Sequence, residues 1–410
     1  MSKSSITAID QNLDDLVAST DLKSDSVQLL RSPERVTKST LALRDDNGKI
    51  RYLPSYRVLY SRARGPGKGG LRFHQSVSEA EMTELAFLMS LKTALVDIPF
   101  GGGKGGVVID PKQLSTAELE RVSRAYMRAF AHAVGPQVDV MAPDVNTSPV
   151  VMAWMLDEYE KITGRHAPAV VTGKPLELGG SQGRVSATGR GAYEILRQRY
   201  SEKDASAVTV AIQGFGNAGQ HLAKLLFEEG FKVVAISDSS GGSYNEAGIS
   251  ITAALEHKRA GNSLADFKEA DGEVISNEEL LELPVDVLAP AALGGVITSE
   301  NAGSVQAGEI LEVANAPVTT SANQLLEQQG VTVIPDILTN AGGVIVSYFE
   351  WIQNQTGEYW TEDQVHTRLK EKLTTNYEAV IKVAEEQSLT LRQAAYYIAV
   401  SRIKAAADLR

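Results

Sequence analysis

The stretch "VTVAIQGFGNAGQHLAKLLFEEGFKVVAISD", residues 208–238, decides the fold. A β-rich run is followed by Gly214, Gly216 and Gly219 in G-x-G-x-x-G order, with Phe215 between the first two, and then by a helical pattern. Asp238 ends the next β-rich run. Small residues let a pyrophosphate approach a helix N-terminus, and an acid at this place accepts hydrogen bonds from a ribose. The pattern predicts a dinucleotide site, with an ordinary tight turn as the alternative.

The same acid bears on the choice of dinucleotide. The Asp238 carboxylate would repel the 2′-phosphate of NADP, and the surrounding "SDSSGGSYNEAG" offers no arginine or lysine to bind one. NAD is therefore favoured as the cofactor. Ser239 and Ser240 could hold a phosphate, so NADP stays open.

Outward from this stretch, strand and helix patterns alternate. "VDVLAPAAL", "EILEVAN" and "VTVIPDIL" are predicted to be further strands, which indicates an α/β fold with a parallel sheet covered on both faces. The glycine-rich "LELGGSQGRVSATGRG" is a plausible domain boundary. We expect a substrate domain over residues 1–185 and a Rossmann-type dinucleotide domain over 186–345. The helices of 346–410 should pack back on the first domain.

Composition narrows the class of protein. The chain has 410 residues, no cysteine, 43% apolar residues and a net charge of −11. The acidic balance argues against nucleic acid and anionic membranes as partners. No signal peptide or membrane-spanning run is visible, so a cytoplasmic protein is expected. The histidines are scattered without ligand spacing, so no metal site is predicted.

Three lysines stand out in the first half of the chain. Lys104 lies among five glycines in "IPFGGGKGGV", which is either a flexible surface loop or a close approach of the backbone to a ligand. Lys68 lies in the glycine-rich "RGPGKGGLRF", and Lys92 is the only charge in an apolar helical run. Lys92 either extends its ammonium to solvent or faces a pocket. Together the lysines suggest capture of a small anion such as a dicarboxylate.

A carboxylate would complete the chemistry. Asp144 in "VMAPDVNTSPVVMAW" comes just before a predicted helix that begins with Ser148 as cap and Pro149 as first residue. Alone it is an ordinary turn residue. Beside a lysine it can transfer protons.

Several motifs together resemble the glutamate dehydrogenases of the Glu/Leu/Phe/Val amino-acid dehydrogenase family. They are "GPGKGGLRFH", "KTALVDIPFGGGKGGVVIDP", "MAPDVNTSPVVMAWMLDEYEK", "GKPLELGGSQGRVSATGRG", "GFGNAG" and "NAGGVIVSYFEW". The resemblance runs from about Tyr52 to the C-terminus. It implies reversible oxidative deamination of L-glutamate to 2-oxoglutarate and ammonium, with hydride transfer to NAD or NADP. It also implies a homohexamer with its active site between the two domains.

Matching motifs imply a role for each site residue. Lys104 resembles the family's catalytic lysine, and Asp144 its proton-transfer residue. Lys92 matches the residue that binds the substrate α-carboxylate, while Lys68 and Ser347 match the pair that binds the side-chain carboxylate. The positions that resemble cofactor contacts are Thr188, Asn217, Asn315 and Asn340.

Two stretches depart from the family's pattern. "EVANAPVT" has Val313 and Ala316 where glutamate dehydrogenases usually read "EGANGPT", and "PAALGGVIT" has two glycines in place of larger polar residues. Both stretches are expected near the cofactor, so the choice between NAD and NADP depends on them.

Two other functions remain open. A leucine, valine or phenylalanine dehydrogenase would have apolar residues in place of Lys68 and Ser347, which disfavours that reading. A non-catalytic nucleotide-binding regulator would have no need for Lys104 and Asp144.

Overall fold

The computed structural model describes residues 3–410, which form two compact units. The first comprises the chain up to Arg184 together with Val344–His366 and Tyr396–Arg410, and the second comprises Val185–Gly343 and Thr367–Ala395. The chain therefore passes between the units four times. The sequence assigned all of 346–410 to the first domain, whereas the structure places Thr367–Ala395 in the second unit.

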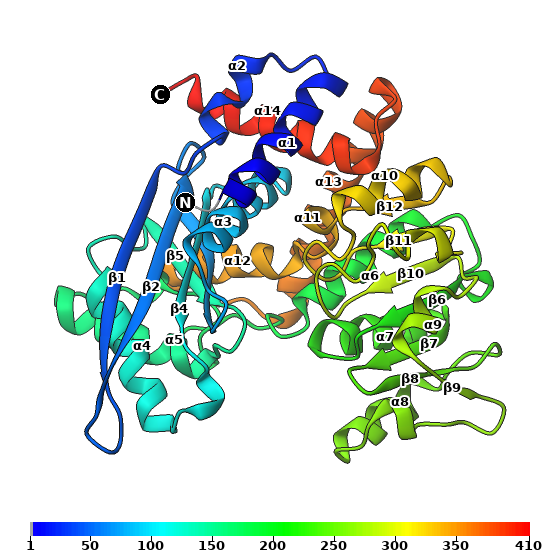
Figure 1. Ribbon diagram of the computed structural model, residues 1–410, viewed down its shortest axis with the longest axis horizontal. Helices are drawn as coiled ribbons and strands as arrows, with labels where there is room; N and C mark the ends of the chain where they lie inside the picture. Colours follow the sequence, from blue (N-terminus) through cyan, green and yellow to red (C-terminus); the bar gives the residue numbers. More distant parts are fainter. Residues whose placement is uncertain (1–2) are drawn as a thin grey trace. The chain divides into compact units, whose positions relative to one another are not determined.

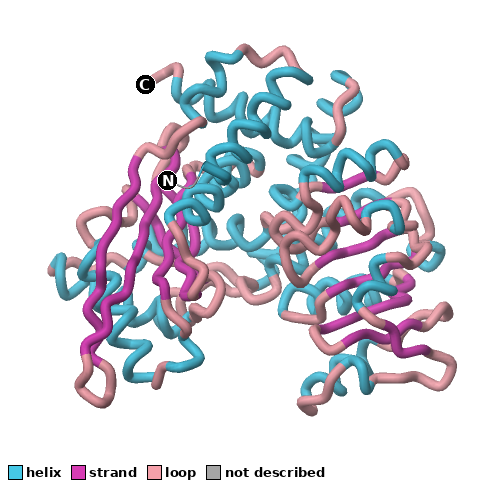
Figure 2. The backbone as a smooth tube through the Cα atoms, viewed as in Figure 1, coloured by secondary structure: helices cyan, strands magenta, loops and turns pink. Residues whose placement is uncertain are grey.

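The first unit contains a five-stranded sheet in the order β1-β2-β4-β3-β5 (Figures 1 and 2). The central strand β4 is antiparallel to β2 and parallel to β3. The N-terminal segment contains both helix α1 and the edge strand β1. The bounds are α1 Lys3–Ser19, α2 Ser24–Val27, β1 Arg35–Arg44, β2 Ile50–Ser61, β3 Gly67–His74, β4 Gly102–Val108 and β5 Asp139–Pro143.

Helices lie on both faces of this sheet. Helix α3 (Glu79–Leu95) packs on the face of β2 and β4, while α4 (Thr116–Phe130) and α5 (Pro149–Thr163) share a core with the other face. Ser148 caps α5 and Pro149 is its first residue, as predicted. Ser78 caps α3 through the Glu81 N–H, but the Glu81 carboxylate pairs with Arg72 instead of closing a capping box.

The C-terminal helices are α12 (Gly342–Thr356), α13 (Glu362–Gln387) and α14 (Leu391–Ala407). The predicted helices within residues 346–410 are confirmed. In the first unit, Arg402 of α14 donates hydrogen bonds to the carbonyl oxygens of Ala94 and Leu95. A cation at the C-terminal end of α3 satisfies carbonyl groups that have no partner within the helix.

The second unit contains a seven-stranded sheet in the order β12-β11-β10-β6-β7-β8-β9. The five strands from β12 to β7 are parallel, and β8 and β9 continue the sheet in antiparallel pairing. This is the Rossmann strand order with the third strand reversed, so the predicted α/β class is confirmed. The strands are β6 Thr209–Gln213, β7 Lys232–Asp238, β8 Gly241–Tyr244, β9 Glu273–Ile275, β10 Val287–Pro290, β11 Glu309–Leu311 and β12 Thr332–Ile334.

The helices of the second unit are α6 Ala187–Arg199, α7 Asn217–Glu229, α8 Ile251–Arg259, α9 Asn277–Leu281, α10 Thr320–Gln328 and α11 Asp336–Thr339. Because the parallel strands all end at one edge, the loops that follow β6, β7, β10 and β11 meet there. Across residues 3–410, no helix combines the length and apolar content needed to cross a membrane.

Candidate functional site

The glycines around Lys104 form a buried strand, so the surface-loop alternative is wrong. A Cβ added to Gly69 on β3 would lie 1.5 Å from the Gly103 carbonyl oxygen on β4. A Cβ on Gly70 would lie 2.7 Å from Asp144 Cβ. The strands approach too closely for any larger side chain. The glycines are thus required by contacts between neighbouring parts of the protein itself.

A buried ion pair that the sequence did not reveal explains two further glycines. Arg57 on β2 donates from Nε to Asp139 Oδ2 at 2.7 Å, and from Nη2 to Oδ1 at 2.5 Å. Both side chains are almost completely buried. A Cβ on Gly67 or Gly103 would lie within 2.8 Å of the Asp139 carboxylate. Because Gly67 on β3 and Gly103 on β4 have no side chains, there is space for this ion pair.

The register of the strands brings Lys104 and Asp144 to the same face. Side chains alternate along a strand, so Lys68 and Gly70 share one face of β3. Gly70 is flanked by Lys104 on β4 and by the end of β5, where Asp144 follows. Because Gly70 has no side chain, Lys104 and Asp144 meet above it.

Lys104 donates a short hydrogen bond from Nζ to Asp144 Oδ2. On its other side, Asp144 Oδ1 accepts from Arg72 Nε at 2.8 Å, and Arg72 also binds Glu81. Burial alone would raise the pKa of Asp144, but Lys104 and Arg72 together hold it well below its ordinary value. Asp144 is therefore ionised here, and Arg72 is a member of the site that the sequence reasoning missed.

Lys68 differs from Lys104 because it has no counter-ion. Its side chain is 1% exposed, and within residues 3–410 it makes neither a hydrogen bond nor an ion pair. Burial, together with the positive charges of Arg184 and Arg57, lowers the pKa of Lys68 to about 7. A buried ammonium without a partner is costly, so this position is suited to an incoming anion.

Helix α12 brings Ser347 and Glu350, which are one turn apart, into the same region of the first unit. Glu350 is close enough to Lys68 to act on its pKa. Ser347 is 2% exposed, and its neighbour Tyr348 packs edge-on against Phe100. The helix therefore carries a buried hydroxyl one turn before the Glu350 carboxylate.

Glu350 already has a cation of its own. Its Oε1 accepts from Lys174 Nζ at 2.7 Å, and its Oε2 accepts from the Gly173 N–H at 2.8 Å. Arg184 lies near Glu350 and Lys68, and its Nε is buried without a hydrogen-bond partner within residues 3–410. Lys174 and Arg184 were not singled out from the sequence, although both lie in a quoted motif.

Lys92 lies in the last turn of α3 and is only 7% exposed. The alternative in which its ammonium extends to solvent is therefore wrong. A buried lysine on the helix that covers the face of Lys104 is suited to a pocket, as the family resemblance implies.

In the second unit, the glycine turn has the form that a pyrophosphate requires. Gly214 has a φ of +99°, and a Cβ on Gly219 would lie 1.9 Å from the Gly214 carbonyl oxygen. A Cβ on Gly216, the N-cap of α7, would meet nothing within 4 Å, and no side chain caps this helix. The backbone is therefore tightly packed at Gly214 and Gly219, whereas there is space for a ligand at Gly216. The N–H groups of the first turn of α7 have no side-chain cap and are suited to binding an anion. Phe215 is buried beside it.

Two predicted contacts lie beside this turn. Asn217 begins α7 and donates from Nδ2 to the Val185 carbonyl oxygen at 2.8 Å. Thr188 is half-buried near the start of α6. The next residue, Gly189, lets α6 approach α7, because its Cβ would lie 2.4 Å from the Ala218 carbonyl oxygen.

Asp238 ends β7, as predicted, but a cation lies beside it. Lys258 of α8 donates from Nζ to Asp238 Oδ2 at 2.7 Å, and the Leu264 N–H donates to the same oxygen at 3.1 Å. Oδ1 accepts from the Ser240 N–H at 2.9 Å. Burial would raise the pKa of Asp238, but Lys258 and the other donors hold it well below its ordinary value. The stretch around Asp238 contains no lysine, and this cation comes from a helix 20 residues further along the chain.

Asn315 and Asn340 are brought together at the same edge of the sheet. Asn340 Nδ2 donates to Asn315 Oδ1 at 3.0 Å and to the Ala314 carbonyl oxygen at 3.1 Å. Ala316, one of the departures from the family pattern, has a φ of +44°. A glycine at this position would adopt such a conformation without strain.

Comparison with known proteins shows to which protein family this chain belongs. Residues 33–161 match the model of the Glu/Leu/Phe/Val dehydrogenase dimerisation domain, and residues 179–410 match that of Glutamate/Leucine/Phenylalanine/Valine dehydrogenase. The chain belongs to this family.

Individual members of the family align along nearly the whole chain. The NADP-specific glutamate dehydrogenase of Synechocystis sp. is 47% identical over 398 residues, which cover 95% of this chain and 93% of that protein. A catabolic NAD-specific glutamate dehydrogenase of Bacillus subtilis is 41% identical over 94% of this chain and 91% of its own. The leucine-bound crystal structure of the hetero-hexameric glutamate dehydrogenase from Thermus thermophilus superimposes with a TM-score of 0.93 and 34% identity, covering 100% and 98% of the two chains.

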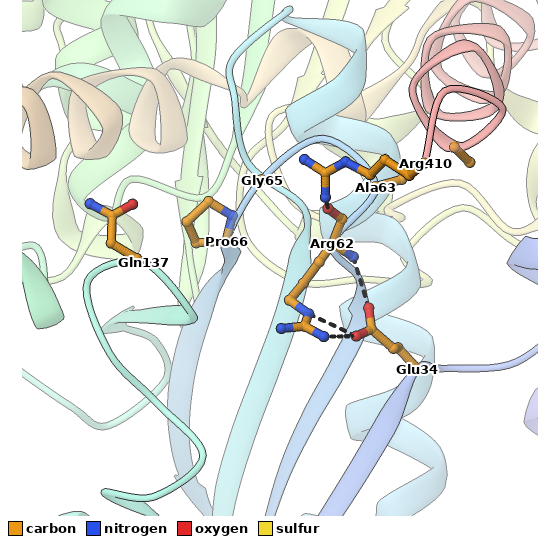
Figure 3. A pocket seen from close by; sticks show the side chains of 8 residues that line it. Glu34, Arg62, Ala63, Gly65, Pro66, Gln137 and Arg410 are labelled. Atoms are coloured by element: carbon orange, nitrogen blue, oxygen red, sulfur yellow. Dashed lines mark hydrogen bonds and ion pairs between the residues drawn. The ribbon is translucent and has the colours of Figure 1, made fainter.

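A separate cavity in the first unit of this dehydrogenase has a volume of about 520 Å³ (Figure 3). Its charged side chains already have partners. Arg62 binds Glu34 through Nε at 2.7 Å, and Arg410 donates from Nη1 to the Arg62 carbonyl oxygen at 3.0 Å. None of the predicted site residues lines this cavity.

The depressed pKa of Lys68 predicts a pH-dependent effect on stability. The folded-state pKa of about 7 lies below the ordinary 10.5, so the unfolded chain binds more protons between these values and stability rises with pH. Lys68→Met should therefore raise the melting temperature, with the larger gain at pH 6 and a smaller one at pH 9.

Lys174→Met is the matched control, since it removes the partner of a buried carboxylate. This variant should lower the melting temperature. Differential scanning calorimetry of the three proteins at both pH values measures these effects. A Lys68→Met variant that is less stable than the wild type at pH 6 would contradict the unpaired state of Lys68.

Proposed function

We infer that this chain is an NAD(P)-dependent glutamate dehydrogenase. It catalyses the reversible oxidative deamination of L-glutamate to 2-oxoglutarate and ammonium. The single observation that carries the choice of glutamate is Lys68, a buried ammonium without a counter-ion. A leucine or phenylalanine side chain would leave that charge unpaired, whereas the γ-carboxylate of glutamate neutralises it.

The substrate is held at both ends in this proposal. Lys68 and Ser347 bind the γ-carboxylate, and Arg184, whose buried Nε has no partner in the described part of the chain, adds positive charge beside them. Lys92 binds the α-carboxylate. The α-carbon of the substrate then lies close to Lys104 and Asp144.

Lys104 and Asp144 carry the proton transfers. A bound nicotinamide would supply the hydride acceptor for the α-carbon, and the oxidised substrate would then carry an iminium group. The hydrogen bond between Lys104 and Asp144 lets Lys104 pass a proton to Asp144 and become neutral. Lys104 then takes a proton from the water that attacks the iminium carbon, and protonated Asp144 gives its proton to the departing nitrogen. Asp144 then takes the hydroxyl proton as the carbon–nitrogen bond breaks, and passes this proton to the released ammonia to form ammonium. Both side chains thereby return to their starting states.

The dinucleotide binds in the second unit, along the carboxyl edge of the sheet. The open N-terminus of α7 would hold the pyrophosphate, and Asn217, Asn315, Asn340 and Thr188 would contact the rest of the cofactor. Asp238 binds the ribose hydroxyls of NAD. Lys258 can also bind NADP, because its ammonium can turn from Asp238 to the 2′-phosphate. We therefore propose that the enzyme prefers NAD and also accepts NADP.

The assembly is a homohexamer in this proposal, and its compartment is the cytoplasm. The edge strand β1 and the exposed side chains of Ile50 and Tyr52 on β2 lie within the part that matches the family's dimerisation domain. An uncovered edge strand beside exposed apolar side chains is suited to pairing with a second copy.

The catalytic assignment predicts a loss of turnover without a loss of cofactor binding. Lys104→Ala should lower kcat by at least about a hundredfold, because it removes the proton acceptor. Asp144→Asn should lower kcat more than it raises KM. NADH binding, measured by fluorescence titration, should stay within twofold of the wild type in both variants, as in the surface control Lys112→Ala. A folded Lys104→Ala enzyme with substantial activity would refute the role of Lys104.

The substrate assignment predicts a switch in specificity. Lys68→Leu combined with Ser347→Val makes the pocket apolar, so the γ-carboxylate of glutamate would be buried without a partner. Activity on glutamate should fall by orders of magnitude, while activity on norvaline, methionine or leucine appears. Steady-state kinetics with these substrates measure the change. A wild type that prefers leucine or phenylalanine, or a double variant that keeps its glutamate activity, would defeat the assignment.

The cofactor assignment predicts unequal effects of Lys258→Met. Without Lys258, the Asp238 carboxylate repels a 2′-phosphate, so kcat/KM for NADP should fall about tenfold or more, as expected for a lost charge-assisted hydrogen bond. The value for NAD should change by less than threefold. Lys224→Met, which alters an exposed pair on α7, is the control and should change neither. Equal losses with both cofactors would show that Lys258 does not reach the phosphate.

A further inference from the structure

Three charged residues meet beneath the cofactor edge of the second unit. Glu312 directly follows β11 and is completely buried, Asp336 begins α11 and is 3% exposed, and Arg392 comes from the start of α14. Arg392 Nη2 donates to Glu312 Oε1 at 2.7 Å, and its Nη1 lies 3.9 Å from Asp336 Oδ1. One guanidinium thus faces two buried carboxylates.

Both carboxylates bind the backbone that surrounds them. Glu312 Oε2 accepts from the Asp336 N–H at 2.8 Å, and Oε1 accepts from the Val318 N–H at 3.4 Å. Asp336 Oδ2 accepts from the Ala316 N–H at 2.9 Å. The two carboxylates therefore bind the loop of residues 313–318 at two backbone N–H groups, those of Ala316 and Val318.

This loop carries Asn315, the proposed cofactor contact. Asn340, its hydrogen-bond partner, donates its own N–H to the Asp336 carbonyl oxygen at 3.0 Å. Both asparagines are thus connected to Asp336, one through the loop and one through α11. Asp336 and Glu312 are in turn joined through Arg392.

Ala316 shows why the loop needs to be held. Its φ of +44° is a conformation that residues with a Cβ rarely adopt. Its N–H is bound by Asp336, and its carbonyl oxygen accepts from the Gly295 N–H at 2.9 Å. With alanine in place of glycine, the loop depends on these bonds to keep this conformation.

We propose that Arg392 is a positioning residue for cofactor binding, which fixes the 313–318 loop through Glu312 and Asp336. Without Arg392, the two buried carboxylates repel one another and lose their common cation. Asp336 then no longer holds the Ala316 N–H, and Asn315 loses its position. This inference rests on the proposed cofactor contact of Asn315.

The test compares two arginines that line the same cavity of the second unit, which has a volume of about 410 Å³. Arg392→Met removes the proposed positioning residue. Arg199→Met is the matched control, because Arg199 pairs with Glu309 and, within residues 3–410, makes no hydrogen bond or ion pair with the loop. Arg392→Lys keeps the charge but not the two-sided geometry of the guanidinium.

Two measurements separate positioning from general destabilisation. Arg392→Met should raise both the Kd for NADH and the KM for the cofactor at least tenfold. The KM for glutamate should change less than threefold. In the cofactor-free protein, hydrogen exchange of the peptide that covers residues 312–319 should quicken. Arg199→Met should lower the melting temperature but leave both readouts within twofold of the wild type. Arg392→Lys should give an intermediate Kd.

Each outcome decides the question. A folded Arg392→Met variant with wild-type Kd and exchange overturns the proposal, and so does an equal effect of Arg199→Met. If Arg392→Met does not fold, a wild-type Kd in Arg392→Lys overturns the proposal in its place. The Asn315→Ala variant tests the cofactor contact of Asn315 separately from the positioning role of Arg392. If it leaves the Kd unchanged, the proposed cofactor contact fails; if it raises the Kd while the Arg392 variants do not, only the positioning role fails.

Discussion

The buried pair of Arg57 and Asp139 is the interaction on which the first unit depends. It joins β2 to β5 across the two strands between them, and Arg57 also donates to the carbonyl oxygens of Gly69 and Gly70. Two charges buried together are stable only when each is fully bonded, and removal of either would leave the other charge without a partner. The glycines of β3 and β4 provide the space for the pair. The close packing of these strands in turn brings Lys104 and Asp144 together above Gly70.

Two of the buried lysines of the first unit, Lys68 and Lys174, differ in whether the folded chain supplies a counter-ion. Lys174 has a carboxylate and backbone partners, and its role is complete within the folded chain. Lys68 has the same chemistry and similar burial but no counter-ion in the described part of the chain. Under the proposed function, the cost of burying this unpaired charge is recovered when the carboxylate of the substrate binds.

The sequence predicted local features well and distant pairs poorly. The strand, glycine turn, helix and acid of residues 208–238 are contiguous, so their spacing alone indicated the second unit. Asp139 was not found because its partner is 82 residues away. For the glycines around Lys104, the sequence left a surface loop and a close approach to a ligand open, because glycine has low intrinsic β-propensity and only packing against β2 and β3 makes this stretch a strand. Lys258 was not predicted for a related reason, since it lies 20 residues after Asp238 in the chain.

The path of the chain has a consequence for how the protein is made. The last segment of the first unit is Tyr396–Arg410, and its Arg402 completes the end of α3, which lies 307 and 308 residues earlier. During synthesis, the N-terminal sheet cannot gain this contact until residues 396–410 have been made. Domains usually fold in order as they emerge, but here the first unit cannot be completed before the second unit has been synthesised. The carbonyl groups of Ala94 and Leu95 at the end of α3 therefore lack their Arg402 partner while the second unit is being made.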